Sequence, residues 1–330
     1  RVQVVKAGED RNILMVDFHH IIWDAVSKSL FIDEFMRLYE GEELPGQLLQ
    51  YKDYTVWQNQ RLSSGSLDKQ GEFWLKQFED KVDVLELPTD FPRPEQRSFR
   101  GSNIRFKLEK DLIDGIHDLC SKTETTLFMV LISAYNILLS KYSGQEDIVI
   151  GTPITGRVHA DLENIMGLFV NTLPMRNQPK RDKTFKDFLK DLRNNTLNAF
   201  ENQEYPFEEL LEKLNLTVQP GRNPLFDTFF VLQNVHISFD AVIPVYEIKS
   251  RTSKFDLMLE AIGGKDYLFL TFEYCTDLFR EETIARMGQD YIRILEEVAA
   301  NQDILIGDIR LEQNYSKVKS KINEDVEFDF

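Results

Sequence analysis

The strongest constraint on the fold lies near the start of the chain, where a short apolar run leads through two histidines into a helical pattern. The run Ile13–Phe18 predicts a strand. Apolar residues at helical spacing predict a helix over Val26–Tyr39, which Gly41 ends. The string His19-His20-Ile21-Ile22-Trp23-Asp24-Ala25 therefore lies at a strand-to-helix turn. A histidine at such a turn can be presented to a reacting group, and its ordinary pKa near neutrality suits proton transfer.

Composition places the chain among globular proteins. Its 330 residues can bury one large core or two lobes, and 42% apolar with 28% charged residues is ordinary for a soluble protein. The formal net charge of -16 argues against nucleic acid or an anionic membrane as the main partner. Leu127–Leu139, the most apolar long stretch, is too short to span a bilayer and predicts a core helix.

The two cysteines, Cys120 and Cys275, have no spacing typical of a disulfide framework. They suggest buried, reduced thiols and a cytoplasmic location. A catalytic thiol is the alternative, but neither cysteine lies in an activating motif. No signal peptide precedes the first apolar run, and the chain begins at Arg1 within an apparent strand, so we expect it to be part of a longer polypeptide.

Strand and helix patterns alternate in both halves of the chain, which predicts an α/β protein with two sandwich lobes. Three prolines in Leu87–Pro94 predict a crossover between the lobes. Strands are predicted at Gln3–Lys6, Asn103–Leu108, Asp147–Ile150, Phe226–Gln233, Phe255–Ile262 and Tyr267–Tyr274. Helices are predicted at Asp68–Phe78, Lys110–Cys120, Thr125–Tyr142, Thr184–Phe200 and Glu281–Ala299.

The histidine string resembles the active-site motif of condensation domains from nonribosomal peptide synthetases. Further segments match motifs of that family in the family's order, and together they cover most of the chain: Tyr51–Trp57, Gly167–Arg176, Asn202–Glu208 and Arg222–Asp227. Any one of these matches is weak, whereas the ordered set is specific. The segment Gly167–Arg176 also fits condensation domains better than the related epimerization domains.

The resemblance implies two chloramphenicol-acetyltransferase-like lobes that form a V around a tunnel. Phosphopantetheine arms of donor and acceptor carrier domains would enter this tunnel from opposite faces. The implied reaction is attack of the acceptor amine on the donor thioester, which forms an amide. The domain would need no metal or organic cofactor of its own, and an adenylation domain would be a neighbour.

The resemblance also implies a division of the chain. Residues 1–98 would be the remainder of the N-terminal lobe with the active-site motif and the crossover, 99–314 the C-terminal lobe, and 315–330 a charged tail or linker. The family carries two motifs upstream of the histidines, and only 18 residues precede His19 here. We therefore expect an incomplete first lobe that aggregates alone or binds the missing N-terminal part of the same domain.

His20 is the predicted catalytic residue, either as the base that takes a proton from the attacking nitrogen or as a group that only positions the amine. His19 is predicted to be structural. Asp24 is predicted to cap the following helix and, by the resemblance, to form a buried salt bridge with Arg157 that shapes the motif. Asn171 and Thr172 are predicted to line the tunnel, with a role at a strand end as the alternative.

A metal site is the rival interpretation of the histidine string. His20 and Asp24 are four residues apart, and His159 or Asp161 would be the third ligand. No clustered set of ligands accompanies them in the sequence, so we predict no metal.

Two residues depart from the family pattern beside the histidines. Trp23 stands where the family has a small residue, and Ala25 where it has glycine. Both are predicted to border the tunnel. We expect Ile21 and Ile22 to supply core contacts, which leaves the indole of Trp23 to narrow the channel beside His20; the alternative is that the indole fills a gap in helix packing. These departures also motivate a second functional hypothesis, a non-catalytic scaffold or docking module of the same fold.

Overall fold

The computed structural model describes residues 1–9, 11–80, 82–216, 219–233, 251–264 and 266–311. The predicted tail at 315–330 lies outside these residues. The chain divides into two compact units, each built from separate stretches of sequence. Unit 1 comprises Arg1–Trp74, Pro153–Thr172 and Gln203–Phe207; unit 2 comprises Leu75–Thr152, Leu173–Asn202 and Glu208–Phe330.

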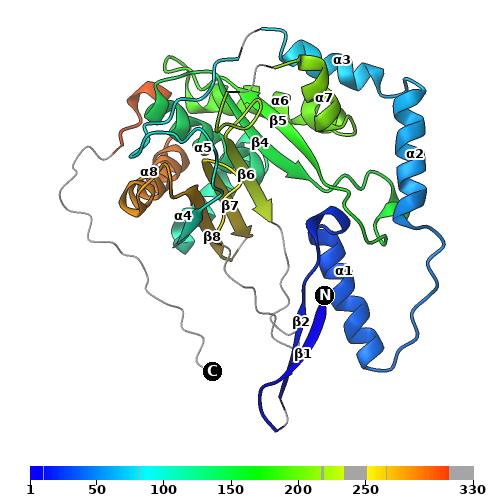
Figure 1. The fold of residues 1–330 in the computed structure, drawn as a ribbon. Helices are drawn as coiled ribbons and strands as arrows, with labels where there is room; N and C mark the ends of the chain where they lie inside the picture. The colour runs from blue at the N-terminus through cyan, green and yellow to red at the C-terminus, as the bar shows by residue number, and fades with distance from the viewer. Residues whose placement is uncertain (10, 81, 217–218, 234–250, 265, 312–330) are drawn as a thin grey trace. The chain divides into compact units, whose positions relative to one another are not determined.

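Unit 2 is organised by a mixed sheet with the strand order β3-β8-β7-β6-β4-β5 (Figure 1). Strand β8 pairs antiparallel with β3 and β7, whereas β6 pairs parallel with β7 and β4. The strands are β3 (Gly101–Lys107), β4 (Ile148–Ile154), β5 (Asn171–Asn177), β6 (Thr228–Gln233), β7 (Leu257–Gly263) and β8 (Leu268–Cys275). The predicted strands in this part of the chain are confirmed.

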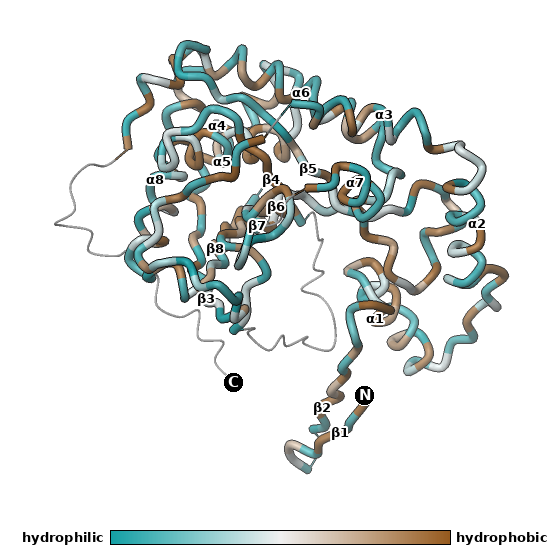
Figure 2. The backbone as a smooth tube through the Cα atoms, turned by 45° about the horizontal axis from the view of Figure 1, so that its top comes forward, coloured by the Kyte–Doolittle hydropathy of each residue, from teal (hydrophilic) through white to brown (hydrophobic). Residues whose placement is uncertain are grey.

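Helices complete unit 2: α4 (Lys110–Thr123), α5 (Leu127–Ser143), α6 (Phe185–Glu201), α7 (Phe207–Leu214) and α8 (Glu281–Ala300). Helix α5 is buried from Met129 to Ser140 and is mainly brown in Figure 2, as expected for a core helix. It begins at the N-cap Thr126 and ends at Gly144, whose left-handed backbone suits glycine. Helix α8 packs against α4, α5 and the strands β3 and β8.

Among the described residues, no single helix is long and apolar enough to cross a bilayer. Helices α4 and α5, bent by 104° at their junction, pass that test of length and composition only as a pair.

Unit 1 begins with a two-stranded antiparallel sheet of β1 (Val2–Lys6) and β2 (Asn12–Val16), in the register Val2↔Val16. A 3-10 turn, η1 (His20–Ile22), then leads into α1 (Ala25–Tyr39). The strand-turn-helix prediction is therefore confirmed. The unit also contains α2 (Tyr51–Ser63), most of α3 (Asp68–Gln77) and the short turn η2 (Ala160–Leu162).

Three elements were absent from the predicted pattern, for identifiable reasons. Helix α2 is polar on most faces, and its clearest sign is local: the Asp53 carboxylate accepts the backbone N–H of Gln50 at 2.8 Å. Strand β5 contains Pro174, which is tolerated because β5 is at the end of the sheet. Helix α7 starts directly after Pro206 and is only eight residues long, too short for a clear period of apolar residues.

The proline-rich segment Leu87–Pro94 belongs to unit 2 and is attached to it along its length. Asp90 accepts hydrogen bonds from Arg280 N–H and from the Thr283 hydroxyl, so it caps the start of α8. Arg93 binds Asp256 through both terminal nitrogens. The division into lobes at residue 98 stays a prediction, because the compact units follow different boundaries.

Candidate active site

The two histidines lie in an exposed turn of unit 1. His19 caps η1, and its Nδ1 accepts the backbone N–H of Ile21 at 3.1 Å. His20 opens the 3-10 turn and is exposed. Within the part of the chain that the structure describes, the imidazole of His20 makes no hydrogen bond or ion pair. Its position therefore follows from the backbone of the turn, and its ring nitrogens are available to a substrate.

Asp24 organises the segment that follows the turn. It is 2% exposed, and its Oδ1 accepts the backbone N–H of Ser27 at 2.7 Å, so it is the N-cap of α1 as predicted. Its Oδ2 accepts the backbone N–H of Phe169 at 3.1 Å. The two backbone N–H groups and an arginine side chain occupy both carboxylate oxygens of Asp24, so Asp24 has no free oxygen for His20.

The arginine is Arg157, and the predicted ion pair is present. Its Nη2 lies 3.2 Å from Asp24 Oδ1, and the two side chains are 4% and 1% exposed. Its Nη1 donates to the carbonyl oxygens of Leu162 and Ile165, and its guanidinium lies 4.1 Å from the centre of the Phe169 ring. Arg157 therefore folds the 153–172 segment around itself and attaches that segment to the start of α1.

Ser27 is a residue that the sequence interpretation missed. Its hydroxyl is completely buried, donates to the carbonyl oxygen of Gly167 and accepts the N–H of the same residue, both at 2.9 Å. It also accepts from Arg157 Nη2 at 3.2 Å. The only available signal was its place three residues after the cap Asp24, where a side chain faces the same side of the helix.

Gly167 is required by close packing with α2. A Cβ at this position would lie 2.1 Å from the ring of Tyr51, too close for any side chain. The Tyr51 hydroxyl donates to the carbonyl oxygen of Leu168 at 2.7 Å, and its ring packs edge-on against Phe169. Helix α2 therefore holds the 167–169 segment through Tyr51, in addition to the bonds from Ser27.

A small apolar cluster lies beneath this arrangement and consists of Tyr54, Leu162, Ile165 and Phe169. Burial is the largest cause that raises the pKa of Tyr54 to about 12, so the phenol is neutral at physiological pH. Tyr54 is a core residue, 9% exposed. Trp57, by contrast, is 38% exposed and lies beneath the guanidinium of Arg61.

Asn171 uses every polar atom of its amide on backbone groups. Its Nδ2 donates to the carbonyl oxygens of Gln203 and Tyr205 at 2.9 and 2.8 Å. Its Oδ1 accepts the N–H groups of Thr172 and Phe207 at 2.8 and 3.1 Å. This geometry favours the strand-end role over direct contact with substrate for Asn171. A contact of Asn171 or Thr172 with substrate stays a prediction.

Trp23 and Ala25 are both accommodated without backbone strain. Ala25 is the first residue of α1 and has no positive φ, so glycine is not needed there. The Trp23 ring stacks on Phe18, with ring centres 4.2 Å apart, and packs edge-on against Phe31 at 5.7 Å. The expectation that Ile21 and Ile22 supply core contacts is wrong, since they are 66% and 58% exposed. The short 3-10 turn points them outward, and Trp23 makes the packing contacts instead.

The rival metal ligands do not gather around His20. His159 and Asp161 form their own exposed pair, with 3.3 Å between Nδ1 and Oδ2. Among the described residues, no group of three His, Cys, Asp or Glu side chains is placed to hold a metal ion.

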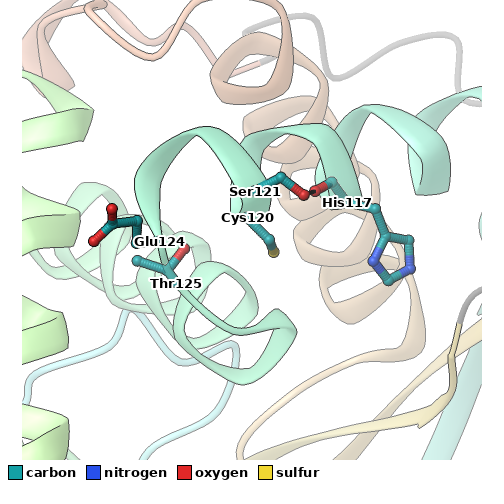
Figure 3. Close-up of a pocket in the computed structure, with 5 residues that line it drawn as sticks. All are labelled: His117, Cys120, Ser121, Glu124 and Thr125. Atoms are coloured by element: carbon teal, nitrogen blue, oxygen red, sulfur yellow. Dashed lines mark hydrogen bonds between the residues drawn. The ribbon is translucent and has the colours of Figure 1, made fainter.

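A pocket in unit 2 has different chemistry. Figure 3 shows its lining residues along and just beyond α4: His117, Cys120, Ser121, Glu124 and Thr125. Burial raises the pKa of the Cys120 thiol to about 11, which is the opposite of the change that activates a nucleophilic cysteine. This pocket therefore does not supply a catalytic thiol.

The fold and the site together define an α/β protein that displays a histidine at a strand-to-helix turn and holds that turn with a buried aspartate–arginine pair. Residues 1–318 match the family model of the Condensation domain, and the chain belongs to that family. The predicted family and the α/β condensation-domain fold are thereby confirmed. Condensation domains of nonribosomal peptide synthetases are amide-forming acyltransferases, and peptide-bond formation is the general function of the family.

Among known proteins, the chain is 45% identical over 332 residues to gramicidin S synthase 2 of Brevibacillus brevis, covering 98% of this chain and 8% of that protein. It is 47% identical over 315 residues to tyrocidine synthase 2 of Brevibacillus parabrevis, covering 94% and 9%. The chain thus spans less than a tenth of the length of these relatives.

Among solved structures, the X-domain from teicoplanin biosynthesis superposes with a TM-score of 0.86 at 23% identity, covering 94% of this chain and 74% of that one. The same X-domain in complex with OxyB superposes with a TM-score of 0.85 at 23% identity, covering 95% and 73%.

Proposed function

We propose that this chain forms the amide bond between a donor acyl or peptidyl thioester and an acceptor aminoacyl thioester, with His20 as its catalytic residue. Both substrates would be carried on phosphopantetheine arms of carrier domains. The acceptor nitrogen attacks the donor carbonyl carbon, a C–N bond forms, the C–S bond breaks, and the donor arm leaves as a free thiol. The growing chain then remains on the acceptor arm.

The role of His20 follows from the proton that this reaction releases. An α-amino group has a pKa of about 8, so part of the acceptor is already a free amine at neutral pH. The nitrogen becomes positive as it attacks, and an imidazole can then accept its proton and pass one to the leaving sulfur. The alternative is that His20 only holds the amine by a hydrogen bond.

The single observation that carries the proposal is the exposed His20 ring beside a buried, fully engaged Asp24. Asp24 is occupied by Ser27, Arg157 and Phe169, so it acts on the shape of the turn and not as a base. Of the two exposed histidines, His19 uses Nδ1 to accept the Ile21 N–H, which leaves His20 with both ring nitrogens for an incoming amine. His19, Asp24 and Arg157 are assigned structural roles in the same proposal.

The partners proposed are the donor and acceptor carrier domains, an adjacent adenylation domain and the N-terminal part of the same domain. The phosphopantetheine would belong to the carriers, and the condensation step itself would use no metal or organic cofactor. A cytoplasmic location is part of the proposal and is supported by the buried, unpaired thiols of Cys120 and Cys275. The lobe division at residue 98 is proposed on the resemblance alone.

The test is a dipeptide-forming assay with loaded donor and acceptor carrier domains, comparing wild type with His20→Ala and His20→Gln. The glutamine amide can donate and accept hydrogen bonds but cannot titrate. Loss of product in both variants supports a base, whereas partial activity of His20→Gln supports positioning of the amine. His117→Ala on α4 is the matched control and should retain turnover. Wild-type turnover in His20→Ala would contradict the catalytic assignment.

The second candidate function is a non-catalytic docking module. It is favoured by one observation, the likeness to an X-domain whose solved structure includes the complex with OxyB. Absence of product from wild type with all carriers loaded, together with stable binding of a synthetase partner, would support this alternative.

A further inference from the structure

The turn that carries His20 is closed by aromatic side chains at its two ends. Phe18 precedes the histidines and Trp23 follows them, and their rings stack at 4.2 Å with planes 15° apart. Phe31, two turns into α1, packs edge-on against both rings, with centres 5.5 and 5.7 Å away. Phe18, Trp23 and Phe31 form what is here called the aromatic cluster, and each of its members is partly buried.

The aromatic cluster matters because few other contacts hold residues 19–22, the part of the turn that precedes the buried Asp24. The turn contributes exposed Ile21 and Ile22, and within the described residues the His20 ring has no polar partner. Its internal bonds are the cap from Ile21 N–H to His19 Nδ1 at 3.1 Å and two 3-10 contacts at 3.2 Å, from Ile22 N–H to the His19 carbonyl and from Trp23 N–H to the His20 carbonyl. Beyond Trp23, the next fixed point is the buried Asp24.

We propose that Trp23 is a positioning residue for His20: by stacking on Phe18 and resting on Phe31, it joins the two ends of the turn and seats them on α1. This inference rests on the proposed catalytic role of His20. It assigns the indole a function that differs from narrowing a substrate channel. It also explains how the bulk of Trp23 is accommodated beside the histidines, since the ring lies against neighbouring rings.

The physical basis is the preference of aromatic rings for offset and edge-to-face packing, which adds to the burial of their area. Contacts of that strength raise the ratio of closed to open forms of the turn by about 3- to 10-fold. If His20 must be placed to meet the acceptor amine and open forms dominate once the cluster is lost, the fraction of competent enzyme falls by close to the same factor. Because the productive conformer is rarer, kcat should fall while KM for each loaded carrier changes little.

The experiment compares Trp23→Ser, Trp23→Phe and Phe18→Leu with wild type in the carrier-loaded assay. Trp23→Ser and Phe18→Leu should each lower kcat by about 3- to 10-fold, and Trp23→Phe should stay within about twofold because it keeps a ring in the stack. The double variant of positions 18 and 23 should be little worse than either single variant, as both remove the same contact. Phe35→Ser is the matched control, since Phe35 stacks on Phe31 one turn further along α1 but does not touch the turn.

A second measurement does not depend on substrate. Amide hydrogen exchange of Ile22 and Trp23, or of the residue replacing Trp23, reports closure of the turn and should accelerate about 3- to 10-fold in Trp23→Ser and Phe18→Leu but not in Phe35→Ser. Unchanged or higher turnover in Trp23→Ser would overturn the proposal. The proposal would also fail if kcat fell as much in Trp23→Phe, or in the control Phe35→Ser, as it does in Trp23→Ser. If His20→Ala proves active, the catalytic assignment fails, while the exchange measurement still decides whether Trp23 closes the turn.

Discussion

Ser27 and Gly167, 140 positions apart in the sequence, exchange two hydrogen bonds: the serine hydroxyl donates to the glycine carbonyl and accepts the glycine N–H, each at 2.9 Å. A single side chain thus satisfies both backbone polar groups of a buried residue. This relationship ties the first turn of α1 to the 153–172 segment and places Phe169 N–H where Asp24 can accept it.

Removing that hydroxyl should therefore destabilise the protein. Ser27→Ala leaves the buried N–H and carbonyl of Gly167 without their partner, and we expect a loss of about 1–3 kcal/mol in the free energy of unfolding. Ser29→Ala on the same helix is the control, because the Ser29 hydroxyl is exposed and donates to the carbonyl oxygen of Ala25 one turn back. Denaturant melts of both variants give the comparison. Equal stabilities would mean that the Ser27 bonds do not hold the segment in solution.

The Asp24–Arg157 pair should show strong coupling. Asp24→Ala and Arg157→Ala each leave a buried charge unpaired, at a cost of about 3–5 kcal/mol, and the double variant should cost clearly less than the sum. The exposed pair of His159 and Asp161 is the contrast, and Asp161→Ala should change stability very little. A double-mutant cycle from urea melts measures this, and strictly additive losses would show that the buried residues are not partners.

The stability of the protein should depend more on the hydrogen-bond donors of the Asn171 side chain than on the size of that side chain. Asn171→Asp points a carboxylate at the carbonyl oxygens of Gln203 and Tyr205, whereas Asn171→Ala only removes the bonds. We expect both to lower stability by about 1–3 kcal/mol or more, with Asp the worse. Asn198→Asp on the exposed face of α6 is the control. The prediction fails if melting temperatures of the position-171 variants match that of Asn198→Asp.

Alkaline pH should weaken the protein partly through Cys120. Burial raises the pKa of this thiol from 9.0 to about 11, so the folded state favours the neutral form. The stabilisation of the folded state by the neutral thiol is fully present below about pH 9. It is lost as pH rises toward 11, because the unfolded chain has already released the proton there. The melting temperature of wild type should therefore fall faster than that of Cys120→Ser across pH 8–11.

The burial of Cys120 can also be tested by alkylation with iodoacetamide at pH 8, followed by mass spectrometry. We expect the thiol to react only after the protein unfolds, and rapid labelling of the native protein would refute the burial argument.

The hairpin of β1 and β2 should promote association. Val4 and Leu14 face each other across the strands and are 67% and 38% exposed, and apolar residues also occupy the other face. A two-stranded sheet is marginal in water, and its free edges can pair with another chain. We expect concentration-dependent association by sedimentation, reduced in the double variant Val4→Thr/Leu14→Thr but not in Val56→Thr on α2. A monodisperse wild type at high concentration would contradict this.

Local patterns determined much of this fold. The period of apolar residues predicted α1, α4, α6 and α8, because a helix that buries one face repeats it along the chain, whereas a continuous apolar run predicted the buried helix α5. The cap Asp24 was visible for a similar reason, since its hydrogen bond to Ser27 closes within three residues. The ordered motifs then identified the family and named His20 and the Asp24–Arg157 pair.

Only the tertiary structure decided how the 153–172 segment meets α1. The bonds of Ser27 to Gly167 and the clamp of Tyr51 on Leu168 join residues more than a hundred positions apart, and no local period records such contacts. The packing of Trp23 was likewise not given by sequence, which favoured an indole that narrows the channel and core positions for Ile21 and Ile22, whereas both isoleucines are exposed. In the structure the indole packs on Phe18 and Phe31, because stacking these rings removes their apolar faces from water.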